Sequence, residues 1–569
     1  MQYQWFYKNS ENKEKAKKLA EALNIPFPNA QLLVQRGIET FEEAKAFFRP
    51  QLSELHNPFL MKDMQKAVER LSKAIENKES ILIYGDYDVD GTTSVALVYS
   101  FLRQYYSAID FYIPDRDNEG YGISYKGIDY AKEKKHSLVI ALDCGIKAVD
   151  KIEYANQQNI DFIICDHHLP AEKLPDAFAI LNSKQKDCNY PDKNLSGCGV
   201  GFKLMQGFAQ KNKIPEEELF SLLDFVAVSI ASDIVPLVGE NRILAYYGLK
   251  KLNSQANVGL QSLIQIAQLE NKEITISDIV FKIGPRINAA GRIKTARSAV
   301  QLLIEQDYTK AKAYANAINT TNTERQQLDK SITTEALQII AKDTAYPQKK
   351  STIVYAPHWH KGVVGIVASR LIEHHYRPTI VLCKNNNLLT GSARSVDKFN
   401  IYKAIDHCSD LIENYGGHQY AAGLSLKEEN LEAFIQKFED YVDAHITKDL
   451  LIPKIEIDLD IKLSDINDKF YNIIRQMAPF GPENMAPVFS TKKIMDNGKS
   501  RVVGKDLSHL KIAITDEEKN QIEGIAFGMG KHYPMISKKT FDICYSLSVN
   551  DFRNVKTLQM EVKDLRESL

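Results

Sequence analysis

The sequence predicts an α/β protein in which a mostly parallel sheet is followed by a second α/β module and then by a small all-β module. Three observations predict this order. Short apolar runs alternate with helical patterns from about residue 65 to 235, which is typical of βαβ units. A strand, helix, strand pattern returns in "STIVYA", "VGIVASRLIEHH" and "PTIVLC", in a module that ends near residue 445. From about residue 450, alternating patterns such as "KIEIDLDIKL", "SHLKIAI" and "FDICYSLSV" indicate a small β-barrel or sandwich.

The remaining segments are predicted from their patterning. Residues 1 to about 50 look helical and polar, and we expect them to pack as an appendage. In the first sheet, "ILIYG", "IDFYIP", "LVIALD" and "DFIICD" are the expected strands, and "TSVALVYSFLRQYY", "GIDYAKEKK" and "AVDKIEYANQQ" are the expected helices. A helical region should continue to roughly residue 340.

Length and composition limit the class of protein. A chain of 569 residues is long enough for about three or four domains, and 44% hydrophobic with 25% charged residues is typical of soluble globular proteins. Lys plus Arg (72) and Asp plus Glu (73) nearly cancel, so a polyanion would have to be held by a local basic groove. The seven cysteines form no C-x-x-C pair, and we find no signal peptide or apolar span, so we expect a cytoplasmic protein without a zinc ribbon.

The stretch "SILIYGDYDVDGTTS" (80–94) places three carboxylates where a strand should pass into a helix. Asp86, Asp88 and Asp90 would then lie beyond the carboxyl end of a strand, where open α/β sheets bind ligands. Helix capping explains one such aspartate but not three. A nucleotide-binding P-loop does not fit, because the glycines have the wrong spacing and no lysine follows the second one.

Two further strands are predicted to end in the same way. "LVIALDCG" ends in Asp143, "DFIICDHHLP" ends in Asp166, His167 and His168, and Asp233 interrupts the apolar run "VSIASDIVPL". Each alone has an ordinary explanation as a satisfied buried acceptor or a packing histidine. Together they would cost several kcal/mol unless cations neutralised them. Oxygen ligands with one or two imidazoles favour Mn²⁺ or Mg²⁺ over Zn²⁺ or Cu²⁺, and two ions about 4 Å apart would suit phosphoryl transfer.

These motifs resemble a known family. "DYDVDG", "LDCG", "DHH" and "ASDIVPL" are similar in order and spacing to the DHH phosphoesterase superfamily, and "GSARS" with "GGHQYAAG" resembles its DHHA1 domain. "SGCGVGFKL" and "GPRINAAGR" are more particular, and with them the chain resembles the bacterial RecJ family of single-strand-specific 5′-to-3′ DNA exonucleases from about residue 60 to its end. The resemblance implies an N-terminal helical appendage (1–60), a DHH domain with a helical extension (61–335), a DHHA1 domain (336–447) and an OB-fold nucleic-acid-binding domain (448–569).

The resemblance also implies roles for individual residues. Two metal ions would be bound by Asp88, Asp90, Asp143, His167 and Asp233, with Asp143 as the bridge. His168 would meet the substrate phosphate, and Asp86 would support the site. The 5′ phosphate would be held by Arg116, Ser392 and Arg394, with His418 pointing into the cleft, and the DNA backbone would be contacted by Arg286, Asn288 and Arg292. Arginine offers a planar fork suited to phosphate oxygens, although without the motifs a salt bridge would explain these arginines first.

The final module implied by the resemblance is an OB-type platform for single strands. The residues available on it are Phe480, Phe489, Lys492, Lys493, Arg501, Lys505 and Lys511, although aromatics in a small barrel are usually core. In "PFGPENMAP", Glu483 stands where glycine is common in the family. We expect the chain to lack the extra C-terminal domain of some longer relatives.

Three functions follow as hypotheses. The first is processive 5′-to-3′ hydrolysis of single-stranded DNA to mononucleotides in DNA repair and recombination, with single-strand-binding protein and a RecQ-type helicase as family-implied partners and a monomer as the default state. The second is a phosphodiesterase for short oligonucleotides or cyclic dinucleotides, which would not need the C-terminal module. The third is a replication-scaffold relative without catalysis, which would have lost metal ligands that this sequence carries.

Overall fold

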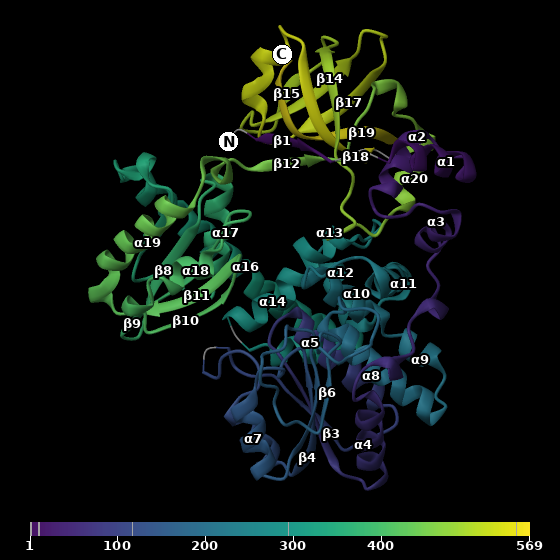
Figure 1. Cartoon of the computed structure of the whole chain (residues 1–569), viewed down its shortest axis with the longest axis vertical. Helices are drawn as coiled ribbons and strands as arrows, with labels where there is room; N and C mark the ends of the chain where they lie inside the picture. Colours follow the sequence, from purple (N-terminus) through teal and green to yellow (C-terminus); the bar gives the residue numbers. More distant parts are fainter. Residues whose placement is uncertain (1–2, 9–11, 117, 294, 553–554, 569) are drawn as a thin grey trace. The chain divides into compact units, whose positions relative to one another are not determined.

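The computed structural model describes residues 3–8, 12–116, 118–293, 295–552 and 555–568. The chain divides into two compact units. Figure 1 labels strands and helices of both. Unit 2 comprises residues 36–323 and 474–486, and unit 1 comprises residues 1–35, 324–473 and 487–569. Among the described residues, no helix combines the length and the apolar character needed to cross a membrane.

Unit 2 is built on a five-stranded sheet of order β3-β2-β4-β5-β6 in which every pairing is parallel. Its strands are β2 (Ser80–Gly85), β3 (Ile109–Tyr112), β4 (His136–Leu142), β5 (Asp161–Cys165) and β6 (Ala179–Leu181). The strand order reverses at β2, because β3 lies on one side of it and β4 on the other. The predicted parallel sheet and its strands are confirmed, and the turn after β2 lies where such sheets bind ligands.

Helices cover both faces of this sheet. Alternate strand residues divide between two cores: Ile83 and Ile140 belong to the larger one, which includes α4, α5 and α8, while Leu82 and Val139 belong to the other. The helices of this sheet are α4 (Met64–Glu76), α5 (Val89–Leu102), α6 (Tyr125–Glu133), α7 (Val149–Gln157) and α8 (Gly197–Asn212). Burial on both faces explains why the strands read as continuous apolar runs.

A helical region completes unit 2 and continues into unit 1 through the long helix α16. Its helices are α3 (Phe41–Phe48), α9 (Glu216–Phe220), α10 (Leu223–Ser232), α11 (Gly239–Gln255), α12 (Val258–Ile266), α13 (Ile276–Asp278), α14 (Gly284–Ile293), α15 (Arg297–Ile304) and α16 (Tyr308–Lys342). The expected helical stretch to about residue 340 is therefore present.

In unit 1, the second α/β module has a sheet of order β10-β11-β9-β8-β7, parallel between β7 and β8 and antiparallel elsewhere. Its elements are β7 (Thr352–Tyr355), α17 (Val364–His374), β8 (Thr379–Asn385), β9 (Leu388–Arg394), α18 (Ile401–Asp406), β10 (Asn414–His418), β11 (Ala421–Leu426) and α19 (Leu431–His445). One face packs on α18 and α19, and α17 with the end of α16 packs on the other.

The C-terminal module of unit 1 is a sheet that closes on itself through pairing of β14 with β16, which is consistent with an OB fold. Its elements are β12 (Lys454–Ile457), β13 (Leu459–Asp460), α20 (Asp468–Gln476), β14 (Phe489–Asp496), β15 (Arg501–Val503), β16 (His509–Thr515), β17 (Gln521–Ala526), α21 (Tyr533–Ile536), β18 (Phe541–Phe552) and β19 (Val555–Glu567). Phe489 is fully buried against Phe470 and Tyr545, so it belongs to the core and does not offer a surface to bases.

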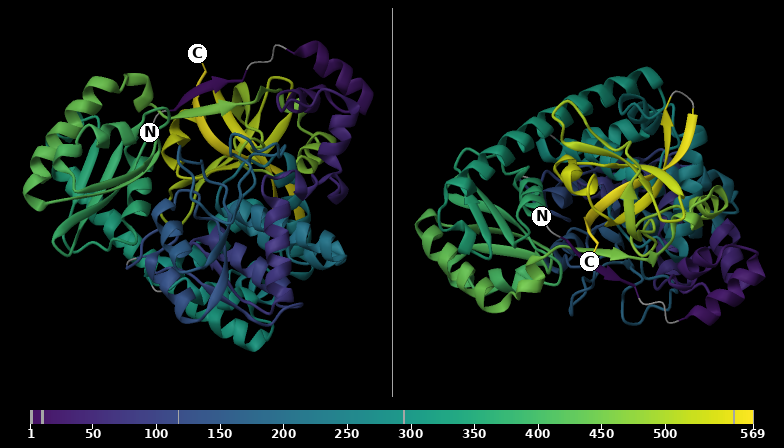
Figure 2. Two further views of the ribbon diagram at one scale, coloured as in Figure 1. Left: turned by 60° about the horizontal axis from the view of Figure 1, so that its bottom comes forward. Right: turned by 90° about the horizontal axis from the view of Figure 1, so that it is seen from above.

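The N-terminal segment differs from the helical expectation. Helices α1 (Lys13–Leu23) and α2 (Phe27–Val34) are present, but Gln4–Tyr7 forms strand β1, which pairs in parallel with β12 (Figure 2). The Trp5 ring is buried, and its Nε1 donates to Asp564 Oδ2 at 2.8 Å. The strand that pairs with β1 lies about 450 residues away in the sequence, so a local sequence pattern cannot predict this pairing.

The segment that leads into the loop "PFGPENMAP" is held by Arg242 within unit 2. The buried Arg242 guanidinium donates to the carbonyl oxygens of Met477 and Ala478 at 3.0 and 3.1 Å, and its face lies 3.7 Å from the Phe47 ring centre. Phe480 lies in this loop, which groups with unit 2, and on none of the described strands of the closed sheet. Glu483 has φ of +62°, the left-handed conformation that favours glycine.

We therefore expect Glu483→Gly to raise the free energy of unfolding by up to about 1 kcal/mol, because it removes a left-handed penalty at an exposed side chain. Chemical denaturation measures the change. Glu483→Ala is the matched control, since it retains the Cβ atom and should bring no gain. A loss of stability in the glycine variant would contradict the prediction.

Candidate metal centre

The turn from β2 into α5 holds its three aspartates in different ways. Asp88 caps α5, because its Oδ1 accepts from the Gly91 amide at 3.0 Å. Asp86 is buried, and its Oδ1 accepts from the Gly122 amide at 3.3 Å. A Cβ at Gly91 would lie 2.4 Å from the Asp86 carbonyl oxygen, so the turn closes this tightly only with glycine.

Asp90 is fixed by the start of α8. Its two carboxylate oxygens accept from the Gly197 and Cys198 amides at 2.7 and 2.8 Å, and from the Ser229 hydroxyl at 2.7 Å. The amides at a helix N-terminus stabilise a negative charge there. The "SGCGVG" segment therefore positions a carboxylate that comes from a different part of the sequence.

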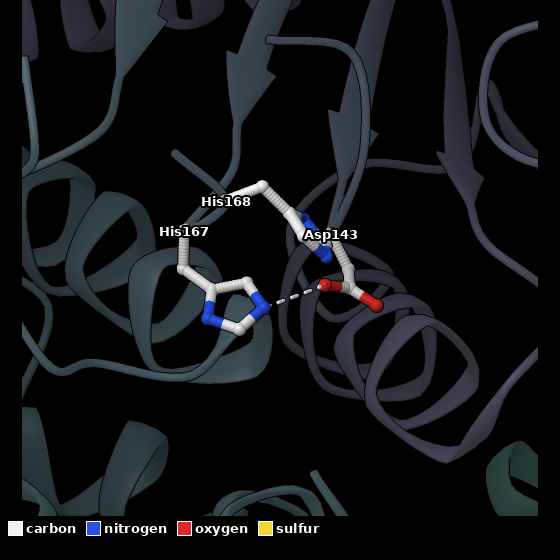
Figure 3. Close-up of side chains that lie close together, drawn as sticks. All are labelled: Asp143, His167 and His168. Atoms are coloured by element: carbon white, nitrogen blue, oxygen red, sulfur yellow. Dashed lines mark ion pairs between the residues drawn. The ribbon is translucent and has the colours of Figure 1, made fainter. Parts of the chain in front are cut away.

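The ends of β4 and β5 bring Asp143 and His167 together (Figure 3). The Nε2 atom of His167 lies 3.2 Å from Asp143 Oδ1. Asp143 has φ of +60°. A Cβ at Gly197 would lie 2.6 Å from the Cβ of Asp143, so the close approach of α8 to Asp143 requires glycine at this position. Sequence patterning placed both residues at neighbouring strand ends, and the structure brings their side chains into contact.

Asp233 reaches the same imidazole from the C-terminal end of α10. Its Oδ2 lies 3.5 Å from His167 Nε2, and Asp90 Oδ2 lies 3.7 Å from the same atom. Two groups with ligand atoms within 4.8 Å of one another result: Asp143 with His167 and His168, and Asp90 with His167 and Asp233. Asp86 and Asp88 lie outside these groups.

The electrostatics of the cluster are unfavourable for carboxylates alone. Burial, together with the charges of Asp90 and Asp88, raises the pKa of Asp143 well above its ordinary value, and the same causes raise the pKa of Asp233 to about 8. Burial, followed by neighbouring carboxylates, also raises the pKa values of Asp86 and Asp88. Folding thus brings together acids that repel one another.

A divalent cation fits this set of donors. Asp143 Oδ1, Asp86 Oδ2 and both ring nitrogens of His167 are buried without a hydrogen-bond partner. Burial lowers the pKa of His167, which keeps its imidazole neutral as metal coordination requires. Carboxylate oxygens with imidazole, and no cysteine in either group, suit Mn²⁺ or Mg²⁺.

His168 has a different environment. Its Nδ1 bonds to Asp166 Oδ1 at 2.7 Å, and Asp166 Oδ2 accepts from the Ile146 amide at 2.9 Å. Burial lowers the pKa of His168, but the hydrogen bond and charge of Asp166 outweigh it and raise the pKa overall. A protonated His168 beside the cluster can donate to a phosphate oxygen.

Three residues near the histidines were missed by sequence reasoning. The Tyr121 hydroxyl lies 3.2 Å from His168 Nε2 and from the Asp143 carbonyl oxygen. Asn182 donates to the His168 carbonyl at 2.9 Å, and Lys184 donates to the His167 carbonyl at 2.5 Å. Glycines with φ of +83° and +80° flank Tyr121, and this "GYG" pattern was the available signal.

Two predicted substrate-binding arginines of unit 2 gather around Tyr87, the residue between Asp86 and Asp88. The Arg116 guanidinium lies 5.1 Å from the Tyr87 ring centre. Helix α14 packs on the same residue, since a Cβ at Gly291 would lie 2.7 Å from the Tyr87 carbonyl oxygen. The positive charge of Arg292 interacts electrostatically with the Tyr87 hydroxyl.

The other two predicted residues of α14 are placed differently. Asn288 is half-buried one turn before Arg292, on the same face of the helix. Arg286 turns toward α16: its Nε donates to Asn319 Oδ1 at 3.0 Å and its Nη1 donates to the Lys282 carbonyl at 2.6 Å.

Ser392, Arg394 and His418 lie together on one face of the sheet in unit 1. Ala421 of β11 pairs with Arg394 on one side and with His418 on the other, and Arg394 Nη1 donates to Ser392 Oγ at 2.8 Å. Gly416 and Gly423 pair on the same face and leave it flat and exposed. The start of α17 borders this face, because a Cβ at Gly365 would lie 3.0 Å from the side chains of Ser392 and Arg394.

Comparison with known proteins assigns the family. The DHH family N-terminal domain matches residues 80–230, the DHHA1 domain matches 348–444, and the RecJ OB domain matches 457–564. The chain is 36% identical to the single-stranded-DNA-specific exonuclease RecJ of Bacillus subtilis (strain 168), over 97% of this chain and 70% of that protein. It is 32% identical to RecJ of Haemophilus influenzae, over 96% and 98% of the two chains.

The chain belongs to the RecJ family. The fold of Thermus thermophilus RecJ, solved in complex with Mn²⁺, matches all of this chain and 80% of that one, with a TM-score of 0.85 at 23% identity. A RecJ exonuclease bound to manganese matches 70% of this chain and 97% of its own, with a TM-score of 0.61 at 28% identity. The RecJ fold therefore extends over both units, each considered by itself.

Proposed function

We propose that this protein is a single-stranded-DNA-specific exonuclease that degrades its substrate from 5′ to 3′ to mononucleotides, with divalent metal ions. The observation that carries the proposal is the cluster in which three carboxylates from separate elements approach one imidazole nitrogen. The family supports the substrate, because its curated members are named single-stranded-DNA-specific exonucleases.

The metal ions would be held by Asp88, Asp90, Asp143, His167 and Asp233, with Asp143 as the bridge. Bound there, Mn²⁺ or Mg²⁺ would polarise the scissile phosphate and activate water for attack on phosphorus. Asp90 is held in place by amides of α8, and His167 stays neutral because it is buried. Asp86 supports the turn through its bond to the Gly122 amide.

Protonated His168 would donate to the phosphate and offset negative charge that develops during hydrolysis. Asp166 supports this state through the 2.7 Å bond, and the Tyr121 hydroxyl limits the position of the ring. His168 thus acts on substrate, while Asp166 and Tyr121 position it.

Phosphates of the strand would be contacted by arginines of both units. We assign Arg286, Asn288 and Arg292 to the DNA backbone near the scissile bond, Arg116 with Ser392 and Arg394 to the phosphate at the 5′ end, and His418 to substrate binding. Ser392, Arg394 and His418 support phosphate binding because they place a hydroxyl, a cation and an imidazole on one flat, partly exposed face.

Arg394→Lys should reduce the preference for a 5′-phosphorylated strand over a 5′-hydroxyl strand by about tenfold, because lysine cannot form two parallel bonds to a phosphate. The kcat/KM ratio for the two strands measures this preference. Lys384→Arg is a control on the neighbouring strand β8, outside the proposed site. An unchanged ratio in Arg394→Lys would contradict the assignment.

We also propose the division of the chain into the parts 1–60, 61–335, 336–447 and 448–569. It is supported by family-model ranges that fall within the last three parts. A role in DNA repair and recombination in the cytoplasm, contact with single-strand-binding protein and a RecQ-type helicase, and a monomeric state belong to the same proposal.

The function is tested by digesting single-stranded DNA labelled at its 3′ end with Mn²⁺ or Mg²⁺, beside a duplex and an RNA of the same sequence. We expect a ladder that shortens from the 5′ end on single-stranded DNA alone. Cleavage restricted to fragments of two to five nucleotides, or to cyclic dinucleotides, would assign the protein to the small-substrate alternative. Strand binding without cleavage would indicate the scaffold alternative, and the family comparisons favour neither.

A further inference from the structure

Two large apolar side chains are exposed directly beside the carboxylate cluster. Ile234 follows Asp233 and is 62% exposed, and Leu169 follows His168 and is 69% exposed. Their segments meet at the cluster, since Asp233 Oδ2 lies 3.5 Å from His167 Nε2. The edge of a site filled with charged groups therefore presents apolar surface to solvent.

The backbone conformation of Ile234 is unusual for an isoleucine. Its φ is +59°, in the left-handed region, at the residue that follows the C-cap of α10. Glycine and asparagine are the usual residues at such a position, and for a β-branched residue this conformation is an outlier. Backbone preference therefore does not account for isoleucine here.

Packing does not account for it either. Most of the Ile234 side chain is in solvent, so burial contributes little to offset the backbone cost. Leu169 is likewise exposed on a segment that is held in place, because Asn182 and Lys184 bind the carbonyl oxygens of His168 and His167. Strain at an exposed residue beside a reactive cluster points to a ligand outside the chain.

The surroundings define the chemistry of that ligand. With the cations of the proposed function bound at the cluster, the ligand would carry an anionic group there and, within one residue's reach of it, an apolar surface that needs no hydrogen bond. A phosphodiester joined to a nucleoside has both features, since the faces of the base and the carbons of the sugar are apolar. A contact without donors or acceptors would also be indifferent to base identity.

We propose that Ile234 is a substrate-contacting residue that packs against the nucleoside attached to the phosphate at the metal centre, with Leu169 offering a second apolar contact from the neighbouring segment. This inference rests on the proposed function and names how that site holds its substrate. It makes Ile234 a determinant of affinity for the strand, independent of its base sequence.

The test is Ile234→Gly, which removes the side chain and also relieves the left-handed strain. We expect its KM for single-stranded DNA to rise about three- to tenfold, as loss of an apolar contact of this size implies. Its thermal midpoint should equal or exceed that of the wild type, so the loss cannot come from misfolding. Ile234→Val keeps most of the apolar β-branched side chain and should raise the KM less than Ile234→Gly does.

Gln268→Gly is the matched control. Gln268 has φ of +57° and is also exposed, and it follows the C-cap of α12 in the same unit, away from the cluster. This variant should gain stability in the same way, with an unchanged KM. An oligonucleotide whose first nucleotides are abasic shows which part of the nucleoside Ile234 contacts. If Ile234 contacts the base, the KM difference between Ile234→Gly and wild type disappears with this substrate. If Ile234 contacts the sugar, the KM difference persists.

The outcomes separate the two proposals. If the wild type fails to digest single-stranded DNA, the proposed function is wrong, and this inference falls with it. If the wild type digests the strand but Ile234→Gly has the KM of Gln268→Gly, only this inference is overturned. A lower thermal midpoint in Ile234→Gly would also overturn it, because Ile234 would then serve the fold.

Discussion

Asp143→Asn should reduce single-strand digestion by at least about a thousandfold while leaving the metal-free fold as stable as the wild type or more stable. Asp143 contacts His167, and in the proposed site it is a ligand of both ions, so its loss would weaken the binding of both. Asparagine has the same shape and tolerates a φ of +60°. It also removes a buried carboxylate whose pKa is raised by burial and by Asp90 and Asp88, which relieves repulsion in the absence of metal.

Two measurements check this prediction together. Initial rates with Mn²⁺ give the loss of activity, and thermal unfolding in a chelator gives the stability. Asp176→Asn is the matched control, an exposed carboxylate of the same unit whose change should affect neither quantity. More than a tenth of wild-type activity in Asp143→Asn would remove this residue from the metal site.

The second large effect is a pH dependence of stability that metal reverses. Without metal, the folded state keeps Asp233 protonated up to a pKa of about 8, whereas the unfolded chain releases that proton near 3.8. Between these values the folded state binds more protons, so stability must fall as pH rises from about 4 to about 8. Cations take the place of those protons, so their stabilising effect should grow over the same range.

Thermal midpoints measured at several pH values, in chelator and in Mn²⁺, test this dependence. The difference between the two conditions should widen toward pH 8 and reach about 5 °C or more when the metal is well above its Kd. Asp233→Asn should make the slope in chelator shallower, because it removes one of the carboxyl groups whose pKa is raised by folding. Parallel slopes in the two conditions would mean that metal ions do not replace protons at this cluster.

Much of the site could be predicted because its signals are local. The apolar runs that form β2, β4 and β5 are strands buried on both faces, and each is followed directly by its acid or histidine. Parallel strands place their carboxyl ends at one edge, so Asp143 and His167 could be placed near each other without coordinates. The family motifs added roles for residues whose patterning alone is neutral, such as Arg116 and Ser392.

Other features depend on contacts between distant parts of the chain. Strand β1 exists because β12 pairs with it, and Asp90 is oriented by amides of α8 more than a hundred residues away. Arg286 bonds to Asn319 on helix α16, and Phe489 is buried in a core that forms only when its sheet closes. None of these partners is visible in a local pattern.

The sequence by itself determined the α/β class, the order of modules and the set of acids and imidazoles that can bind metal, since hydrophobic periodicity and strand-end chemistry act within a few residues. Only the tertiary structure decided how those groups share a site. It placed three carboxylates around His167, paired Asp166 with His168, and left Ile234 strained and exposed beside them. The physical reason is that pKa values, strain and exposure depend on neighbours in space, and folding supplies those neighbours from segments far apart in the chain.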